Sequence, residues 1–218
     1  MFSERAQSDL RNDLVYSIER GRHQKHILAF LKSNLCECAT RLTGATRNDL
    51  ASMCEDDISR QVVRLLNEKL REGSGYLFMF EAKRGPDIWI YAVPCKPFTS
   101  ELFLIEAKRL PPTSPRDYVR TGIGRFKREE HGKEHEEAVL LGYIQANDFA
   151  YWQAKVNSWI GELIGSPDEK PSWAAQDRLC THELTAVGLY TSTHSRMTAR
   201  PIRLHHIWIR LVKDTTRN

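Results

Sequence analysis

The spacing of apolar residues changes at Gly73-Ser-Gly75, and this change constrains the fold more than any other feature of the sequence. Before it, apolar residues recur every three or four positions, which is typical of amphipathic helices. After it, short apolar runs alternate with turns that contain Gly or Pro, which is typical of strands. The sequence therefore predicts helices followed by a sheet, and the expected fold class is α/β with a mixed sheet.

Two helical regions are expected before the change. Residues 4–45 are predicted to form two helices separated at Gly21, and Thr46–Gly73 to form one further helix or two joined ones. The apolar stripe of the second region consists of Ile58, Val62, Leu65, Leu66 and Leu70. Glu55 lies seven residues before Val62 and so on the same face, where burying an unpaired carboxylate is costly.

Strands are expected in two groups after the change. The first three form a meander, and the later strands flank a strong amphipathic helix that Asp148 caps. The predicted strands are Tyr76–Glu81, Asp87–Val93, Glu101–Lys108, Ala138–Gln145, Leu184–Tyr190 and Ile202–Val212. Partial helix is expected from Asp117 to about His131, and the capped helix is expected to run to Ile164.

Composition argues against several classes of protein. No apolar run is long enough to span a membrane, and the charged N-terminus lacks the apolar stretch of a signal peptide, so a cytoplasmic location is expected. The five cysteines form no CxxC pair, which indicates reduced thiols, and the histidines lack the spacing of zinc ligands. The net charge of +4 permits a nucleic-acid partner without requiring one.

The tetrapeptide Glu-Ala-Lys-Arg occurs twice, at residues 81–84 and 106–109, each time after an apolar run. In the second copy, Glu106 and Lys108 share one face of a predicted strand. The preceding hairpin places Asp87 directly opposite Glu106, where side chains in an antiparallel pair lie about 5 Å apart. The main-chain carbonyl of Ala107 lies between them. Two carboxylates and a carbonyl at one point are suitable ligands for a divalent cation.

The first copy has weaker support. Lys83 leads into the Gly85-Pro86 turn and is expected to point to solvent. Glu81 lies across from Asp87 on the other side of its strand. It either adds a third carboxylate to the site or belongs to a charge pair at the edge of the sheet.

The pattern Pro86-Asp87, 18 residues, then Glu106-Ala107-Lys108 resembles the motif of the PD-(D/E)XK nuclease superfamily. The resemblance covers about half of the chain. It implies a restriction-endonuclease-like core of helix, three-stranded meander, helix and strand. Residues 46–218 would form the nuclease domain with extra C-terminal strands, and residues 1–45 an N-terminal helical extension. The competing interpretation is a surface cluster of ion pairs.

The resemblance also implies roles for individual residues. Asp87 and Glu106 would bind Mg²⁺ or Mn²⁺ together with the Ala107 carbonyl. Lys108 would orient the attacking water or help to deprotonate it. Glu55 is the best match for a glutamate on the preceding helix, with Asp56 as the alternative. In-line attack and departure of the 3′ oxygen would leave a 5′ phosphate.

Four residues are candidates for contact with nucleic acid. Arg109 follows the motif directly, and Arg125 and Lys127 lie where the superfamily's helix faces its substrate. A solvated helix face explains Arg125 and Lys127 equally well, because several glutamates follow them. Gln145 ends the predicted Ala138–Gln145 strand, near a position where some members of the superfamily place a glutamine at the site.

The function that follows is a metal-dependent endonuclease. Double-stranded DNA is the expected substrate, and a homodimer is expected if both strands are cut, because each cut needs a site. A restriction or antiviral defence system, with a partner protein, is the context suggested by analogy. The alternatives are an RNA nuclease or nickase with the same residues, a binding module of nuclease ancestry that does not cleave, and an adaptor protein.

Overall fold

The computed structural model describes residues 4–45, 53–70, 76–81, 87–92, 101–111, 116–166, 168–184 and 186–212. Helices come first and a seven-stranded sheet follows. The elements are α1 (Glu4–Ala45), α2 (Glu55–Lys69), β1 (Tyr76–Phe80), β2 (Ile88–Ala92), β3 (Glu101–Leu110), the π-helical η1 (Tyr118–Ile123), α3 (Gly124–Lys127), β4 (Glu137–Ile144), α4 (Phe149–Leu163), the 3₁₀ turn η2 (Ala175–Asp177), β5 (Cys180–Leu184), β6 (Gly188–His194) and β7 (Ile202–Arg210).

The sheet is mixed, as the sequence predicts. Its strand order is β1-β2-β3-β4-β7-β6-β5. The three central strands β3, β4 and β7 run parallel, and the strands on either side pair antiparallel. The meander β1–β2–β3 is followed by the short helices η1 and α3, and then by β4 beside β3.

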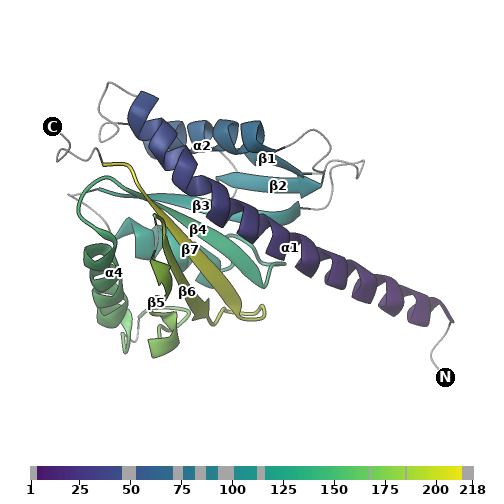
Figure 1. Ribbon diagram of the computed structural model, residues 1–218. Helices are drawn as coiled ribbons and strands as arrows, with labels where there is room; N and C mark the ends of the chain where they lie inside the picture. Colours follow the sequence, from purple (N-terminus) through teal and green to yellow (C-terminus); the bar gives the residue numbers. More distant parts are fainter. Residues whose placement is uncertain are drawn as a thin grey trace.

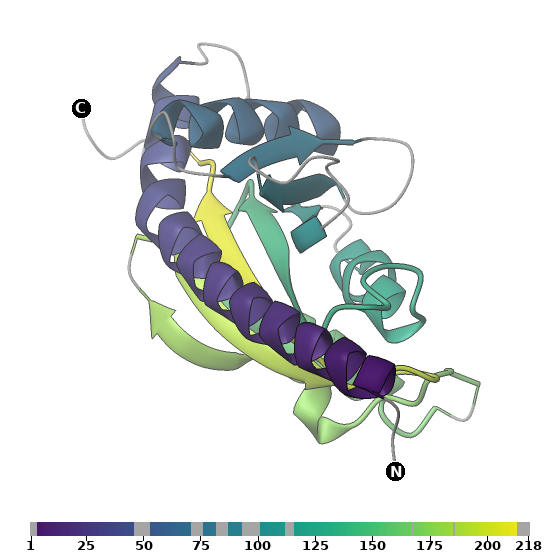
Figure 2. The same ribbon diagram turned by 90° about the vertical axis from the view of Figure 1, so that its right-hand side faces the viewer.

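Helices cover both faces of the sheet (Figures 1 and 2). The long helix α1 crosses one face, with α2 beside it, and its N-terminal end projects beyond the sheet in Figure 1. The core on this face joins Leu31 and Val62 to sheet residues such as Ile105. The short helices η1 and α3 and the helix α4 pack on the opposite face, where Tyr118 and Trp152 belong to a second core. Burial on both faces explains the continuous apolar run of β4.

The expected break at Gly21 is wrong, because α1 continues through it as one 42-residue helix. A glycine inside a helix costs only about 1 kcal/mol relative to alanine. The stripe that includes Ile27, Leu31 and Leu35 is fully or almost fully buried, and each such side chain contributes about 1.5–3 kcal/mol. Packing therefore outweighs the local preference of a single residue.

The second helical region is shorter than predicted. Within the described residues, α2 begins at Glu55 after an extended Cys54 and ends before an extended Leu70 rather than at Gly73. Its stripe of Ile58, Val62, Leu65 and Leu66 is buried as expected. Residues 46–52 lie outside the described part of the chain.

Of the two predicted C-terminal strands, the first is wrong. Instead of one strand over Leu184–Tyr190, the chain forms the antiparallel pair β5 and β6. Cys180, Thr181 and His182 are exposed at the edge of the sheet, so the start of β5 shows no alternation of apolar and polar residues. The predicted strand over Ile202–Val212 is confirmed as β7.

The middle of the chain follows the prediction closely. Residues from Tyr118 to Lys127 are helical in two short pieces, and β4 occupies Glu137–Ile144. The backbone N–H of Tyr151 donates a hydrogen bond of 2.7 Å to the carboxylate of Asp148, which therefore caps α4 as expected.

Two expectations from composition can be compared with the structure over the described residues. None of the helices in these ranges combines the length and the apolar character that crossing a membrane requires. The four cysteines that can be described are all free thiols.

Candidate metal and phosphate site

The β2–β3 register brings Asp87 and Glu106 together. Ile88 pairs with Ile105, so the preceding Asp87 lies beside Glu106, as the length of the hairpin predicts. The register shifts between Ile90 and Tyr91, farther from the site. The backbone N–H of Ala107 donates a hydrogen bond of 2.7 Å to Oδ2 of Asp87, which ties this carboxylate to β3.

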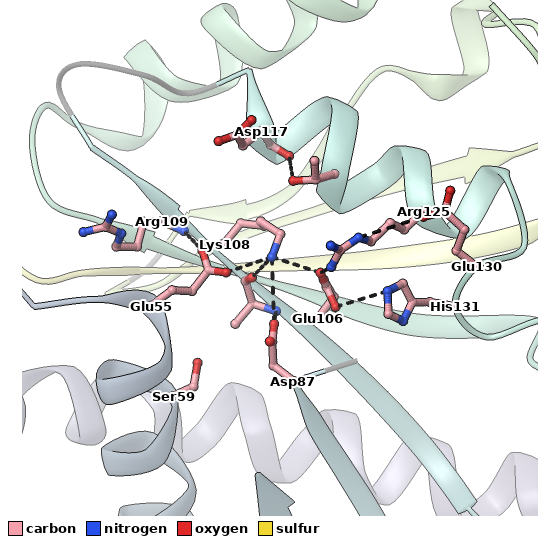
Figure 3. Close-up of polar contacts among 12 residues, drawn as sticks. Glu55, Ser59, Asp87, Glu106, Lys108, Arg109, Asp117, Arg125, Glu130 and His131 are labelled. Carbon is pink, nitrogen blue, oxygen red and sulfur yellow. Dashed lines mark hydrogen bonds and ion pairs between the residues drawn. The ribbon is translucent and has the colours of Figure 1, made fainter. Parts of the chain in front are cut away.

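The ammonium group of Lys108 lies at the centre of the cluster (Figure 3). Its Nζ donates to the Ala107 carbonyl at 2.7 Å and to Oε1 of Glu55 at 2.8 Å. Nζ also lies 2.9 Å from Oε1 of Glu106 and 4.0 Å from Oδ2 of Asp87. The ammonium group of Lys108 therefore lies among the oxygens that the resemblance assigns to a divalent cation.

Glu55 joins the cluster from the first turn of α2. Its Oε2 accepts a hydrogen bond of 2.8 Å from the backbone N–H of Arg109, while Oε1 accepts from Lys108. These bonds explain how a carboxylate in line with the apolar stripe is tolerated, because the charge is paired where α2 meets β3. Glu55 is thus a carboxylate of α2 that contacts Lys108, and its choice over Asp56 as a site residue stays a prediction.

Glu106 is fully buried, and among the described residues only one of its two carboxylate oxygens has close polar partners. Oε1 contacts both Lys108 and Nη1 of Arg125, each at 2.9 Å. Oε2 receives no hydrogen bond from the described residues, and its neighbour is Nε2 of His131 at 4.0 Å. Sequence reasoning missed His131, because no spacing in the sequence links it to the Glu-x-Lys motif.

Burial and the neighbouring charges shift the pKa values of Asp87 and Lys108. Burial, and then repulsion from Glu106, raise the pKa of Asp87 to about 7. Burial opposes the charge of Lys108, but the carboxylates of Glu106, Glu55 and Asp87 outweigh it, and the pKa of Lys108 is raised. Lys108 is therefore an ammonium ion at neutral pH.

The oxygens of the cluster are suitable ligands for a hard divalent cation, although in this structure they are spaced around an ammonium group. No three His, Cys, Asp or Glu side chains in the described ranges are arranged as a ready-made metal cage. Carboxylates and a main-chain carbonyl are nevertheless the ligands that Mg²⁺ prefers. The buried Oε2 of Glu106, which lacks a hydrogen bond from those residues, is an oxygen that an ion would satisfy.

Two of the residues predicted to contact nucleic acid lie at the rim of the cluster. Arg125 reaches Glu106 and keeps 37% of its side chain exposed. Arg109 is partly buried, and its guanidinium donates to the Met53 carbonyl at 3.0 Å. Gln145 lies at the end of β4 and is buried.

Lys127 does not point toward the site and cannot serve as a surface contact for phosphate. It is 1% exposed and forms an ion pair of 2.9 Å with Asp177. Residues two positions apart on a helix point about 200° apart, so Lys127 faces the core when Arg125 faces Glu106.

Lys127 ends a chain of buried hydrogen bonds beneath η1 and α3. Burial lowers the pKa of both histidines in the chain, so each is neutral at pH 7 and donates from one nitrogen while accepting at the other. Asp177, His194 and Ser192 follow the order of a hydrolase triad, but Ser192 is only 4% exposed. The members in order of contact are Trp208, Tyr118, His206, Ser192, His194, Asp177 and Lys127.

The first Glu-Ala-Lys-Arg copy is mostly outside the described residues. Lys83 and the Gly85-Pro86 turn belong to that part. Glu81 is exposed, and its backbone N–H donates to the Asp87 carbonyl at 2.9 Å. This main-chain contact continues the β1–β2 ladder and leaves the role of the Glu81 side chain as a prediction.

Comparisons with sequence families, with curated proteins and with solved structures each find no match. A functional assignment therefore depends on the residues of the cluster and their geometry.

Proposed function

We propose that this protein is a divalent-metal-dependent nuclease that hydrolyses phosphodiester bonds, with DNA as its substrate. The observation that carries the proposal is the convergence of three carboxylates, a main-chain carbonyl and a lysine at one point on β3. They come from the motif of Asp87, Glu106 and Lys108 and from a separate helix through Glu55. A surface ion cluster does not account for the complete burial of Glu106.

The residues divide into cation ligands and phosphate ligands. Asp87, Glu106 and the Ala107 carbonyl would hold the ion, which offsets negative charge on the reacting phosphate and favours ionisation of a bound water. The Ala107 N–H orients Asp87 toward the site through its 2.7 Å hydrogen bond. The charged ammonium of Lys108 favours orientation of the water and contact with the phosphate over removal of a proton.

Arg125 and Arg109 would bind the flanking phosphates. The guanidinium of Arg125 contacts Glu106 and is sufficiently exposed to exchange it for a phosphate oxygen. Arg109 reaches the cluster through its backbone N–H, and its guanidinium donates to the Met53 carbonyl beside it. Such contacts carry affinity without reading sequence. Cutting both strands of a duplex requires two sites, so the proposal includes a homodimer for a double-strand cutter.

The first prediction is loss of cleavage in three variants. Plasmid DNA is incubated with Mg²⁺ or Mn²⁺ and the wild type, Asp87→Ala, Glu106→Ala or Lys108→Ala, and products are resolved on a gel. Each variant is expected to lose at least about a thousandfold in rate, because each removes a cation ligand or the lysine charge at the phosphate. Circular dichroism tests whether each variant keeps its fold.

Glu81→Ala is the matched control from the first copy of the tetrapeptide, and it should retain most activity. Lys83→Ala should also do little, and a loss as large as that of Lys108→Ala would contradict the choice of the second copy. Binding of DNA without cleavage by the wild type would instead favour a module that no longer cuts. Matched DNA and RNA substrates distinguish the DNA nuclease from an RNA nuclease.

A further inference from the structure

The ammonium group of Lys108 lies among the oxygens that the proposed function assigns to a divalent cation. Three oxygens surround Nζ at 2.7–2.9 Å, and a fourth, from Asp87, lies at 4.0 Å. The set includes both carboxylates and the carbonyl of the proposed ligand group. Lys108 thus makes the contacts that the cation would make (Figure 3).

Two cations cannot share these oxygens. Mg²⁺ and Ca²⁺ bind oxygen at about 2.0–2.6 Å, so an ion bound to the same atoms would lie within a few ångströms of Nζ. Positive charges that close in a buried site repel strongly. The side chain of Lys108 is only 8% exposed, so in this structure its ammonium stays within the cluster rather than in solvent.

We propose that Lys108 acts as an internal counter-ion, and that a divalent cation binds only when the Lys108 ammonium leaves the cluster. This inference rests on the proposed function, from which it takes the ligand set. Oε2 of Glu106 supports it independently, because it is buried and receives no hydrogen bond from the described residues. An entering ion thus finds an oxygen that Lys108 does not use. The exchange delivers the lysine to the phosphate only after the ion has arrived.

Cation binding in the absence of nucleic acid tests the exchange. Titration calorimetry with Mg²⁺ and with Ca²⁺ compares the wild type, Lys108→Met and the control Lys155→Met. Lys155 lies on α4, with its Nζ 5.7 Å from the centre of the Trp159 ring. Lys108→Met keeps the apolar stem and removes the charge, so it is expected to bind either ion at least about tenfold more tightly than the wild type. Lys155→Met should bind like the wild type.

Chemical labelling gives a second measurement that needs no variant. Reductive methylation followed by mass spectrometry reports how accessible each lysine amine is. Lys108 should be protected without divalent cation and become labelled at saturating Ca²⁺. Lys133, with 60% of its side chain exposed, should be labelled equally in both conditions.

Parallel incubation of the wild type with plasmid DNA and Mg²⁺ separates the exchange from the nuclease assignment. Cleavage with no gain of affinity in Lys108→Met and no change in labelling would overturn the exchange alone. Tighter binding and cation-dependent labelling without cleavage would support the exchange and count against the nuclease. If neither the wild type nor Lys108→Met binds Mg²⁺ or Ca²⁺, both the exchange and the nuclease assignment are overturned.

Discussion

Asp87 bears a large electrostatic cost in the candidate site. Its side chain is only 15% exposed, and burial together with Glu106 raises its pKa to about 7, whereas an aspartate in an unfolded chain titrates near 4. Between these values the folded state binds more protons than the unfolded state. The contribution of Asp87 to stability therefore falls as the pH rises from about 4 to 7, and the loss is complete above pH 7.

Asp87→Asn should stabilise the protein while it abolishes cleavage. An asparagine oxygen can still accept the hydrogen bond from Ala107, but the charge is gone. In EDTA the free energy of unfolding is expected to rise by about 2–4 kcal/mol at pH 8 and by less at pH 5. Urea unfolding at the two pH values measures the difference. A gain of equal size at both would show that the charge is not its source, and Asp168→Asn, at an exposed position, is the control.

The direction in which a side chain points can be predicted from the sequence where local backbone geometry fixes it. Strand alternation and the length of one hairpin place Asp87, Glu106 and Lys108 together, and helix phase places Glu55 on the buried face. Contacts made by Arg125 and His131 depend instead on how η1 and α3 pack on the sheet. Nothing in the local sequence distinguishes Arg125 from Lys127, and only the packing shows that they face opposite ways.

Two glycines show how an element's surroundings decide what a residue does. A Cβ on Gly142 of β4 would lie 2.3 Å from Cδ1 of Trp208 on the paired strand β7. The indole cannot move freely, because its N–H donates to Tyr118 at 2.7 Å. Around Gly21 of α1, by contrast, the described residues place no atom within 4 Å of the added carbon apart from the backbone of α1 itself.

Alanine at these two positions should have opposite effects on stability. Gly142→Ala is expected to lower the free energy of unfolding by about 2–3 kcal/mol or more through overpacking. Gly21→Ala is expected to raise it by about 0.5–1 kcal/mol, because alanine loses less entropy in a helix. Thermal and urea unfolding of both variants provide the test. Destabilisation by Gly21→Ala would argue for a close neighbour that the structure does not contain.

At the scale of the whole molecule, α1 is part of the main body and not an appendage. Its buried side chains belong to the same core as α2 and one face of the sheet. They are Ile27, Leu28, Leu31, Leu35, Cys38, Ala39 and Leu42. The sequence predicts helical structure over residues 4–45, although as two helices separated at Gly21, and the domain boundary at residue 45 stays a prediction.

A fragment of residues 46–218 is therefore expected not to fold. Removing even one fully buried leucine such as Leu31 costs about 2–5 kcal/mol. The fragment lacks all of the buried side chains of α1, and the summed cost exceeds the free energy of unfolding of a typical domain. A chain that begins at residue 21 keeps every core residue named above and should remain folded. Circular dichroism and proteolysis of the two truncations make the comparison. A cooperatively folded 46–218 fragment would show that α1 is dispensable.

The position of β7 inside the sheet has a consequence for biosynthesis. This strand comprises residues 202–210, yet it lies between β4 and β6, which precede it in the sequence. Until the ribosome has made it, both of those strands present unpaired edges to other chains. The sheet therefore cannot close before residues 202–210 have been synthesised, and a nascent chain that stalls earlier is a candidate for aggregation or for a chaperone.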